Sequence, residues 1–261
     1  FGEAVYNTSA GSGSLETSDF ALSISGGTAT LSSSTPSSIS ASGNIYTLGI
    51  GLSGTPDGSE VFTVVPIDDG VYDGAGNEAS TTQSNNTVTL NDQTAPTVSS
   101  VTATTADGSY KVGDVIAITV TFSETVTVTG TPQLTLETGS SDAIVDYASS
   151  SGATLTFNYT VAAGENSSDL DYKNTSALAL NSGTIKDAAG NAATRTLAAI
   201  GATNSLGANK ALIIDTTVPT ISSVALASNN STIAVTFGEA VYNTSAGSGS
   251  LETSDFALSI S

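Results

Sequence analysis

The feature that most constrains the fold is a long internal repeat. Residues 1–25, FGEAVYNTSAGSGSLETSDFALSIS, recur without a change as residues 237–261, so the second copy begins 236 residues after the first. Identity over this length at a fixed offset indicates a tandem array, in which each repeat packs against its neighbours in series. We therefore interpret the chain as one full period of 236 residues followed by the beginning of the next.

A weaker repeat inside the period indicates two related domains. Three pairs of segments carry it: NDQTAPTVSSV (91–101) with IDTTVPTISSV (214–224), VTFSETV (120–126) with VTFGEAV (235–241), and YDGAGNEAS (72–80) with KDAAGNAAT (186–194). Three domain ranges follow: a domain lacking its first two strands at 1–93, a complete domain at 94–216, and the first strands of the next copy at 217–261.

The segments between these motifs alternate apolar and polar residues, which indicates β-strands with one buried face. Two matching stretches show this most clearly, with one face formed by Tyr46, Leu48, Ile50 and Leu52, and by Leu155, Phe157, Tyr159 and Val161. Further strands are predicted to begin at Phe20, Glu60, Val115, Gln133 and Ala211. No stretch has a convincing helical period. Many short strands in domains of this size predict an all-β chain of tandem immunoglobulin-like antiparallel β-sandwich domains arranged as a rod.

Composition excludes several classes of function. The chain has 24 acidic and five basic residues and no His, Cys, Trp or Met. Nucleic-acid binding is not expected, because basic patches that neutralise phosphates are absent. No apolar run is long enough for a transmembrane segment. Without His, Cys or a recognisable nucleophilic Ser, we expect no enzyme.

The acidic charge is unevenly distributed. All five basic residues lie between residues 94 and 216, and residues 1–93 hold acidic residues only. One interpretation is that the charge keeps a surface protein soluble. The other is that some of the carboxylates bind cations, and their placement favours this second interpretation.

The order of the motifs resembles that of the bacterial Ig-like repeats of very large surface proteins and adhesins. The resemblance rests on the DxTxPT linkers, on VTFSE after the second strand and on DxxGN before the last, and it covers the whole chain. The linker NDQTAP is also similar to a cadherin junction. The resemblance implies an exported, multi-domain rod, located at the cell surface or in a secreted filament, with calcium at or near the domain ends.

Strand direction brings several acidic motifs to one pole of a domain. If the first strand runs away from the linker that holds Asp92, the second returns, so Glu124 ends near that linker. The DAAGN loop, with Asp187 and Asn191, precedes the last strand and is expected at the same pole. The equivalent residues elsewhere in the chain are Glu3, Asp73 and Asn77 in the first domain, and Asp215 and Glu239 at the next junction.

Calcium suits such a cluster, because it takes six to eight oxygen ligands in flexible geometry. Zinc prefers the absent His and Cys side chains, and three carboxylates without a cation would repel one another. We therefore expect Ca²⁺ at these residues. The alternative for DxxGN is a plain turn in which Asp accepts hydrogen bonds from its own loop. A second acidic loop, with Glu165, Asp169 and Asp171, could form another calcium site, but a solvated loop is the favoured interpretation.

Two functions fit these observations. The first is a calcium-stiffened structural module of a stalk or filament, in which the number of repeats sets the reach. The alternative is an adhesive module that binds a glycan or protein on a surface or in a biofilm matrix. The expected partners are neighbouring repeats or identical chains. We expect either that a longer polymer supplies the strands missing from residues 1–93 or that neighbouring chains donate them.

Overall fold

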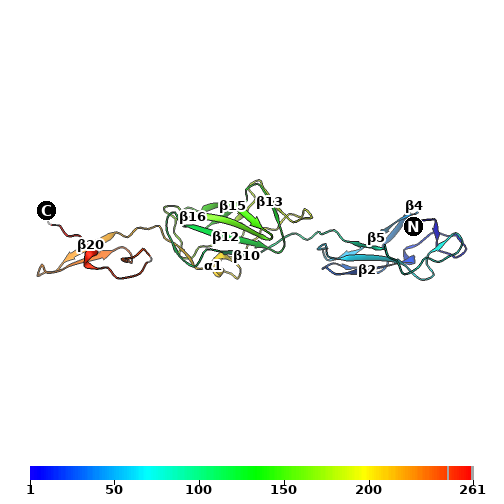
Figure 1. Cartoon of the computed structure of the whole chain (residues 1–261), viewed down its shortest axis with the longest axis horizontal. Coiled ribbons are helices and arrows are strands. Elements are labelled where there is room, and N and C mark those ends of the chain that lie inside the picture. The colour runs from blue at the N-terminus through cyan, green and yellow to red at the C-terminus, as the bar shows by residue number, and fades with distance from the viewer. Residues whose placement is uncertain (246, 260–261) are drawn as a thin grey trace.

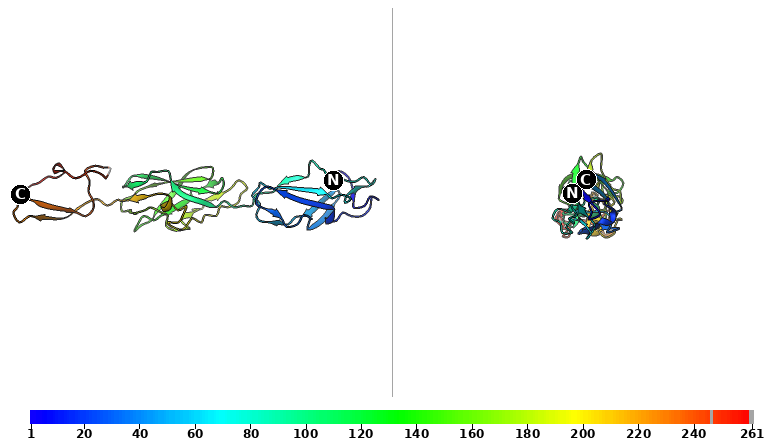
Figure 2. Two further views of the ribbon diagram at one scale, coloured as in Figure 1. Left: turned by 90° about the horizontal axis from the view of Figure 1, so that it is seen from below. Right: turned by 90° about the vertical axis from the view of Figure 1, so that its right-hand side faces the viewer.

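The protein is a row of three β-structured bodies (Figure 1). The structure, a computed structural model, describes residues 1–245 and 247–259. We name residues 1–91 the N-terminal body, residues 95–215 the central body, and the described residues from 217 onward the C-terminal body. Extended segments join them along one axis, and a view down that axis superimposes the three (Figure 2). The predicted domain limits, at 93/94 and 216/217, fall in these segments. They stay predictions, because the shape of the chain does not show which parts fold independently.

Ten strands and one helical turn build the central body. They are β10 (Val98–Ala103), β11 (Gly108–Tyr110), β12 (Val115–Phe122), β13 (Thr127–Thr129), β14 (Gln133–Leu136), β15 (Ala143–Ser151), β16 (Thr154–Thr160), β17 (Leu178–Ala179), β18 (Thr184–Lys186), β19 (Leu212–Ile214) and α1 (Leu206–Asn209). Six strands form a ladder in the order β10-β12-β16-β15-β14-β17. Two further pairs lie beside it: β13 with β18, and β11 with β19 in parallel.

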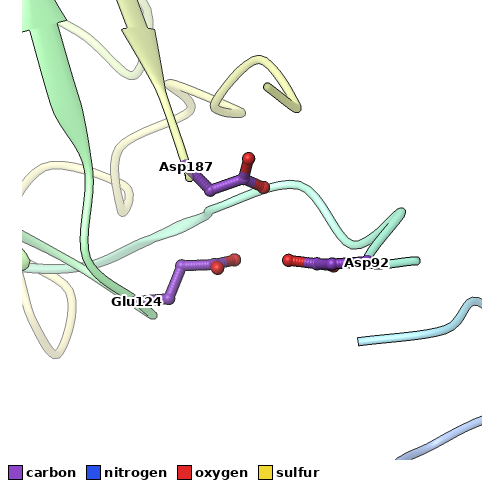
Figure 3. Close-up of side chains that lie close together, drawn as sticks. All are labelled: Asp92, Glu124 and Asp187. Carbon is purple, nitrogen blue, oxygen red and sulfur yellow. The ribbon is translucent and has the colours of Figure 1, made fainter. Parts of the chain in front are cut away.

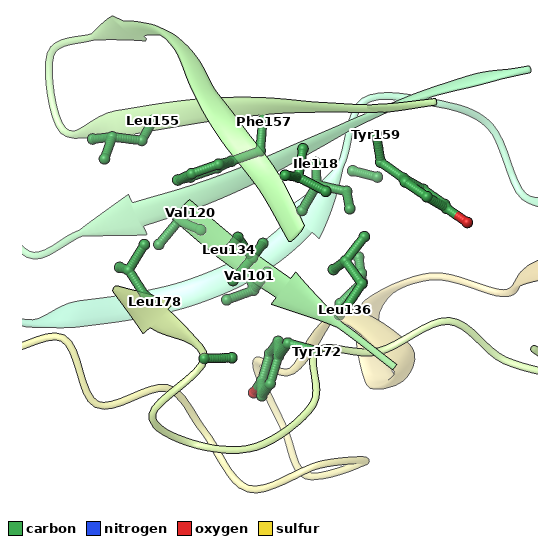
Figure 4. Close-up of a cluster of buried hydrophobic side chains, with 14 of the residues drawn as sticks. Val101, Ile118, Val120, Leu134, Leu136, Leu155, Phe157, Tyr159, Tyr172 and Leu178 are labelled. Carbon is green, nitrogen blue, oxygen red and sulfur yellow. The ribbon is translucent and has the colours of Figure 1, made fainter. Parts of the chain in front are cut away.

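Strand β15 connects the two layers of the central body. Its first half pairs with β14 and its second half with β16, with a register shift between Tyr147 and Ser149 where the strand bends. Alternate residues of the strands point between the layers, where Leu134, Leu155 and Phe157 are fully buried (Figure 4). The predicted all-β sandwich is confirmed in this body.

The N-terminal body has shorter strands and a smaller core. Its elements are β1 (Val5–Tyr6), β2 (Phe20–Ser25), β3 (Thr30–Leu31), β4 (Ser38–Ser42), β5 (Ile45–Gly49), β6 (Leu52–Ser53), β7 (Val61–Pro66), β8 (Tyr72–Asp73), β9 (Thr87–Thr89) and the 3-10 turn η1 (Thr17–Asp19). Only Val5, Leu15, Phe20 and Val71 form its buried cluster. Tyr46 and Leu48 of β5 are half-buried, whereas the corresponding side chains of β16 are fully buried.

The C-terminal body is a hairpin followed by a loop. Its elements are β20 (Ile221–Leu226), β21 (Ile233–Phe237) and the 3-10 turn η2 (Thr253–Asp255). Every residue of β20 is exposed. The end of the range predicted as the next repeat, residues 260–261, lies outside the described residues.

The two copies of the repeated segment share two local features among the described residues. Glu16 and Asp19 form a capping box around η1, and Glu252 and Asp255 form the same box around η2. The ring centroids of Phe1 and Phe20 are 6.4 Å apart, and those of their counterparts, Phe237 and Phe256, are 6.5 Å apart. These two features therefore persist in different surroundings, whereas strands β1 and β2 of the first copy have no counterpart among the described residues of the second.

Most predicted strands are present with small differences. The strands expected from Phe20, Val115 and Gln133 begin at those residues, whereas those expected from Glu60 and Ala211 begin one residue later. The stretch from Tyr46 to Leu52 is divided between β5 and β6, which pair with different strands. The single turn α1 was not predicted, because four residues are too few to show a helical period.

Candidate metal centre

Three carboxylates meet at the end of the central body that faces the N-terminal body. Asp92 lies on the connecting segment, Glu124 follows β12, and Asp187 follows β18 (Figure 3). One oxygen from each lies within 4.8 Å of the others. Among the residues that the structure describes, this is the one group of three acidic side chains close enough to share a cation.

Backbone hydrogen bonds attach the Glu124 loop to the connecting segment. The amide of Ser123 donates to the carbonyl oxygen of Thr97 at 2.8 Å, and the amide of Thr97 donates to Oγ of Ser123 at 3.0 Å. The return of β12 toward the linker therefore ends in a fixed contact, which places Glu124 beside Asp92.

The DAAGN loop holds Asp187 by its own hydrogen bonds. The amides of Gly190 and Asn191 donate to Oδ1 of Asp187 at 2.7 and 2.8 Å, and Nδ2 of Asn191 donates to Oδ2 at 2.8 Å. Gly190 has a φ of +99°, a backbone conformation that favours glycine. Burial opposes ionisation of Asp187, but the hydrogen bonds from Asn191 and its neighbours together lower its pKa.

Asn191 also connects the loop to the linker. Its Nδ2 lies 3.3 Å from the carbonyl oxygen of Asp92 and 3.4 Å from that of Thr94. Asn191 thus presents its amide nitrogen to these oxygens, and it would have to rotate its amide to act as a cation ligand. The geometry is compatible with both interpretations of DxxGN, a plain turn and a cation site. The turn is present, and its Asp187 also belongs to the carboxylate cluster.

A fourth carboxylate approaches from the N-terminal body. The carbonyl oxygen of Pro56 accepts hydrogen bonds from the Gln93 amide and the Thr94 hydroxyl, both at 2.9 Å, which seats the loop of Asp57 on the linker. The pKa of Glu124 is raised, first by burial and then by the charges of Asp92, Asp187 and Asp57. The centre therefore accumulates uncompensated negative charge from two bodies.

Sequence reasoning missed Asp57. The strand-direction argument applies within a single domain, so it identifies only the loops at the linker pole of residues 94–216. Applying the same argument to residues 1–93 would have placed the PDG turn before β7 at the outgoing pole, opposite Asp92.

The predicted counterparts in the N-terminal body are only partly brought together. Asp73 accepts hydrogen bonds from the amides of Ala75 and Asn77, both at 2.8 Å, and from Nδ2 of Asn77 at 2.7 Å. The side-chain hydrogen bond from Asn77 is the main cause of the lowered pKa of Asp73. Glu3 is exposed and belongs to no group of three carboxylates within the part of the chain described.

The next junction shows the same local geometry around Asp215. The Thr217 amide donates to Oδ1 of Asp215 at 3.0 Å, as the Thr94 amide donates to Oδ1 of Asp92 at 2.8 Å. Glu239 follows β21 as Glu124 follows β12 and is half-buried. No third acidic side chain joins these two among the described residues.

The second acidic loop, with Glu165, Asp169 and Asp171, is not simply solvated, because two of its three carboxylates accept hydrogen bonds from the central body. Glu165 accepts a 2.8 Å hydrogen bond from the Tyr159 hydroxyl, and Asp171 is 6% exposed and accepts from the Gly201 amide at 3.2 Å. Only Asp169 remains exposed as expected. Two of the three acids therefore act as hydrogen-bond acceptors that hold loops of the central body.

The donor set at Asp92, Glu124 and Asp187 fits a hard cation. Three carboxylates supply oxygen ligands only, which are the ligands that Ca²⁺ takes. Side chains preferred by zinc or copper are absent from the sequence, which has no His and no Cys. The oxygens of the three carboxylates lie close enough to share one ion. Burial raises the pKa of Glu124 most, and the charge of a bound ion would relieve the repulsion from the neighbouring carboxylates that raises it further.

Comparison with known proteins gives one match. Residues 92–200, which include the carboxylate cluster, match a family model described as a bacterial Ig-like domain. Searches of curated proteins and of solved structures find no match. Within the described residues, no helix is long and apolar enough to cross a membrane.

Proposed function

Because residues 92–200 form a bacterial Ig-like domain, we propose that the chain is a structural segment of an extracellular stalk or filament in which Ca²⁺ stiffens the joints between domains. Domains of this family occur in bacterial surface proteins and are generally non-catalytic structural or adhesive modules. The proposal adds a specific role to that description, namely control of bending at the linker.

The observation that carries the proposal is the convergence of three carboxylates at a joint. Asp92 belongs to the linker, whereas Glu124 and Asp187 belong to the central body. A shared cation would therefore connect the linker to the domain that follows it. Short linkers otherwise allow relative domain motion by default, so a bound cation at this place would reduce bending.

The expected gain in stability is modest. For a dissociation constant of about 0.1 mM and millimolar free calcium, mass action adds about 1.4 kcal/mol to the free energy of unfolding. This corresponds to a rise of roughly 5 °C in the Tm of a domain of this size.

Calorimetry and scattering on the full chain test the proposal. Titration of Ca²⁺ into chelator-treated protein is expected to give saturable binding, a higher Tm and a narrower distribution of maximum dimensions in small-angle scattering. Asp92→Asn keeps an acceptor for the Thr94 amide but removes a charge, so it should weaken binding. Asp114→Asn is the matched control, because Asp114 accepts a 2.9 Å hydrogen bond from the Lys111 amide in a turn outside the cluster. Equal binding by both variants, or no binding by the parent chain, would contradict the proposal.

A further inference from the structure

The linker that follows the N-terminal body is held by a loop of that body. The carbonyl oxygen of Pro56 accepts hydrogen bonds from the Gln93 amide and the Thr94 hydroxyl, both at 2.9 Å. A carbonyl oxygen has two lone pairs, so this one acceptor can bind two successive residues of the linker. Pro56 is buried, and its bond to the Thr94 hydroxyl is partly buried. We name this arrangement, one acceptor oxygen of a loop and two donors of the linker, the linker clamp.

The linker that follows the central body is held in the same way by a different chemical group. Oδ1 of Asn166 accepts a hydrogen bond from the Thr216 amide at 2.9 Å and a longer one from the Thr217 hydroxyl at 3.4 Å. The Thr216 hydroxyl oxygen in turn accepts from the Gly164 amide at 3.0 Å. The second linker clamp therefore uses the same two donors as the first, the amide of the residue after the linker Asp and the hydroxyl of the next residue.

The acceptors of the two clamps occupy equivalent positions in their bodies. Pro56 lies two residues after Gly54, and Asn166 lies two residues after Gly164. The two glycines have similar φ values of +84° and +92°. The acceptor is a backbone carbonyl in one body and a side-chain amide in the other, so the shared property is the position of an oxygen and not a residue type. An oxygen placed at the same point by two chemical groups indicates that the contact with the linker has a role of its own.

The central body binds the chain almost immediately after the first clamp. The carbonyl oxygen of Pro96 accepts a hydrogen bond from the Thr194 amide at 2.8 Å, which fixes Pro96 to the central body. Only Ala95 separates Pro96 from the clamped Thr94. A proline has a fixed φ and confines the residue before it to extended conformations. The backbone between the clamp and the central body therefore has little conformational freedom.

From these contacts we infer that the linker clamp fixes each linker to the body that it leaves, so that bending between the N-terminal and central bodies is confined to Ala95. The second linker has the same design, with Val218 between the clamped Thr217 and Pro219. The hydrogen bonds and the proline thus keep successive bodies extended along one axis. This inference goes beyond the proposed function, because the clamp requires no cation.

The clamp and the carboxylate cluster act on opposite sides of Ala95. Asp92 lies on the clamped linker, whereas Glu124 and Asp187 lie on the central body. A cation shared by the three would connect the two sides and restrict the motion that the clamp leaves at Ala95. The clamp is tested in chelator, so a failure of the proposed cation and a failure of the clamp give different results.

Double electron-electron resonance on the full chain in chelator tests the position of the hinge. Spin labels at S23C and N158C measure a distance across the first joint, because both residues are exposed on strands and the natural chain has no Cys. The labelled parent should give one narrow distance distribution, and Ala95→Gly should broaden it, because glycine restores backbone freedom. Ala163→Gly, at an exposed loop residue outside this joint, is the matched control and should give the parent distribution. A parent distribution as broad as that of Ala95→Gly, or a control that broadens equally, would overturn the inference.

The same pair of labels tests the first clamp. Thr94→Val removes the hydroxyl donor to Pro56 but keeps the Thr94 amide that donates to Asp92. Loss of one hydrogen bond should raise the fraction of molecules with a released linker about fivefold, which adds a second, broader component to the distribution. Thr94→Ser keeps the hydroxyl and should give the parent distribution. Equal distributions from the Val and Ser variants would contradict a clamp at Pro56.

Amide hydrogen exchange, followed by NMR, tests the second clamp independently. Asn166→Ala removes the acceptor of the Thr216 amide, which should then exchange about fivefold faster. The Gln93 amide, bound to Pro56 in the other clamp, should exchange as in the parent. Asn166→Asp keeps an acceptor oxygen and should protect Thr216 as the parent does. Unchanged exchange of Thr216 in Asn166→Ala would refute the second clamp.

Discussion

The buried carboxylate of Glu60 accepts a 2.9 Å hydrogen bond from the backbone nitrogen of Ala29. Three more backbone amides, those of Thr28, Asp57 and Gly58, donate to the same carboxylate at 2.9 to 3.2 Å. The bond from Ala29 is the largest cause of the lowered pKa of Glu60, and burial opposes it. A single charged side chain thus holds the loop that carries Asp57 against the neighbouring segment.

Glu60 should make the N-terminal body sensitive to acid. A carboxyl group with a lowered pKa in the folded state contributes stability above its ordinary pKa of 4.5 and loses it as pH falls through the folded value. Glu60→Gln should therefore destabilise the N-terminal body at neutral pH, and the difference from the parent should shrink in acid. Urea unfolding at several pH values measures this. Asp68→Asn, at an exposed residue of the same body, is the control and should show no such convergence.

Glu124→Gln should have opposite effects with and without calcium. Its carboxyl group is surrounded by Asp92, Asp187 and Asp57, so removing its charge should raise the Tm in chelator. The same change removes a proposed ligand, so the calcium-dependent gain of roughly 5 °C should largely disappear. Differential scanning calorimetry measures both effects. Glu137→Gln, at an exposed acid outside the cluster, should keep the full calcium response.

Asn191→Ala should loosen the joint between the first two bodies. The variant loses the contacts of Nδ2 with the carbonyl oxygens of Asp92 and Thr94 and with Asp187, at a cost of about 1 kcal/mol for the loop. Small-angle scattering should show a wider range of dimensions. Asn77→Ala removes the same loop hydrogen bond in the N-terminal body, where no linker contact is described, and should leave the dimensions unchanged. Identical scattering from all three proteins would disprove the linking role of Asn191.

Phe157→Ala should be among the most destabilising single changes in the central body. The ring is fully buried between the layers, and truncations of this kind cost about 3–5 kcal/mol. Leu48→Ala, at the equivalent position of β5, should cost less in the isolated chain because Leu48 is only half-buried. Urea denaturation of both variants measures the difference, and equal losses would contradict the weaker burial of Leu48.

The convergence of Asp92, Glu124 and Asp187 was predictable because it depends on strand direction. A strand that leaves a linker and a strand that returns must end at the same pole, and motif order identifies which residues lie there. The all-β fold was predictable because apolar and polar residues alternate with a period of two in long strands such as β16, whose buried and less buried side chains alternate in the structure.

Other features of the candidate site and the fold depend on contacts between residues far apart in the sequence, which no local sequence pattern can reveal. Asp57 joins the centre only because two bodies meet at the linker. Glu60 is a charged residue at the start of a strand, and its complete burial depends on backbone amides of a distant loop. The direction of the Asn191 amide is decided by the carbonyl oxygens around it.

The parallel pairing of β11 with β19 determines how the central body carries tension. The chain enters this body just before β10 and leaves it just after β19, at opposite ends (Figure 1). Pulling on the two linkers would slide β19 along β11, so that the hydrogen bonds of the pairs from Gly108–Leu212 to Tyr110–Ile214 are loaded together. Bonds loaded together in shear must fail together, whereas bonds at the end of a peeled hairpin fail singly. Single-molecule pulling should therefore find the central body mechanically stronger along the rod axis than when force is applied across β15 and β16.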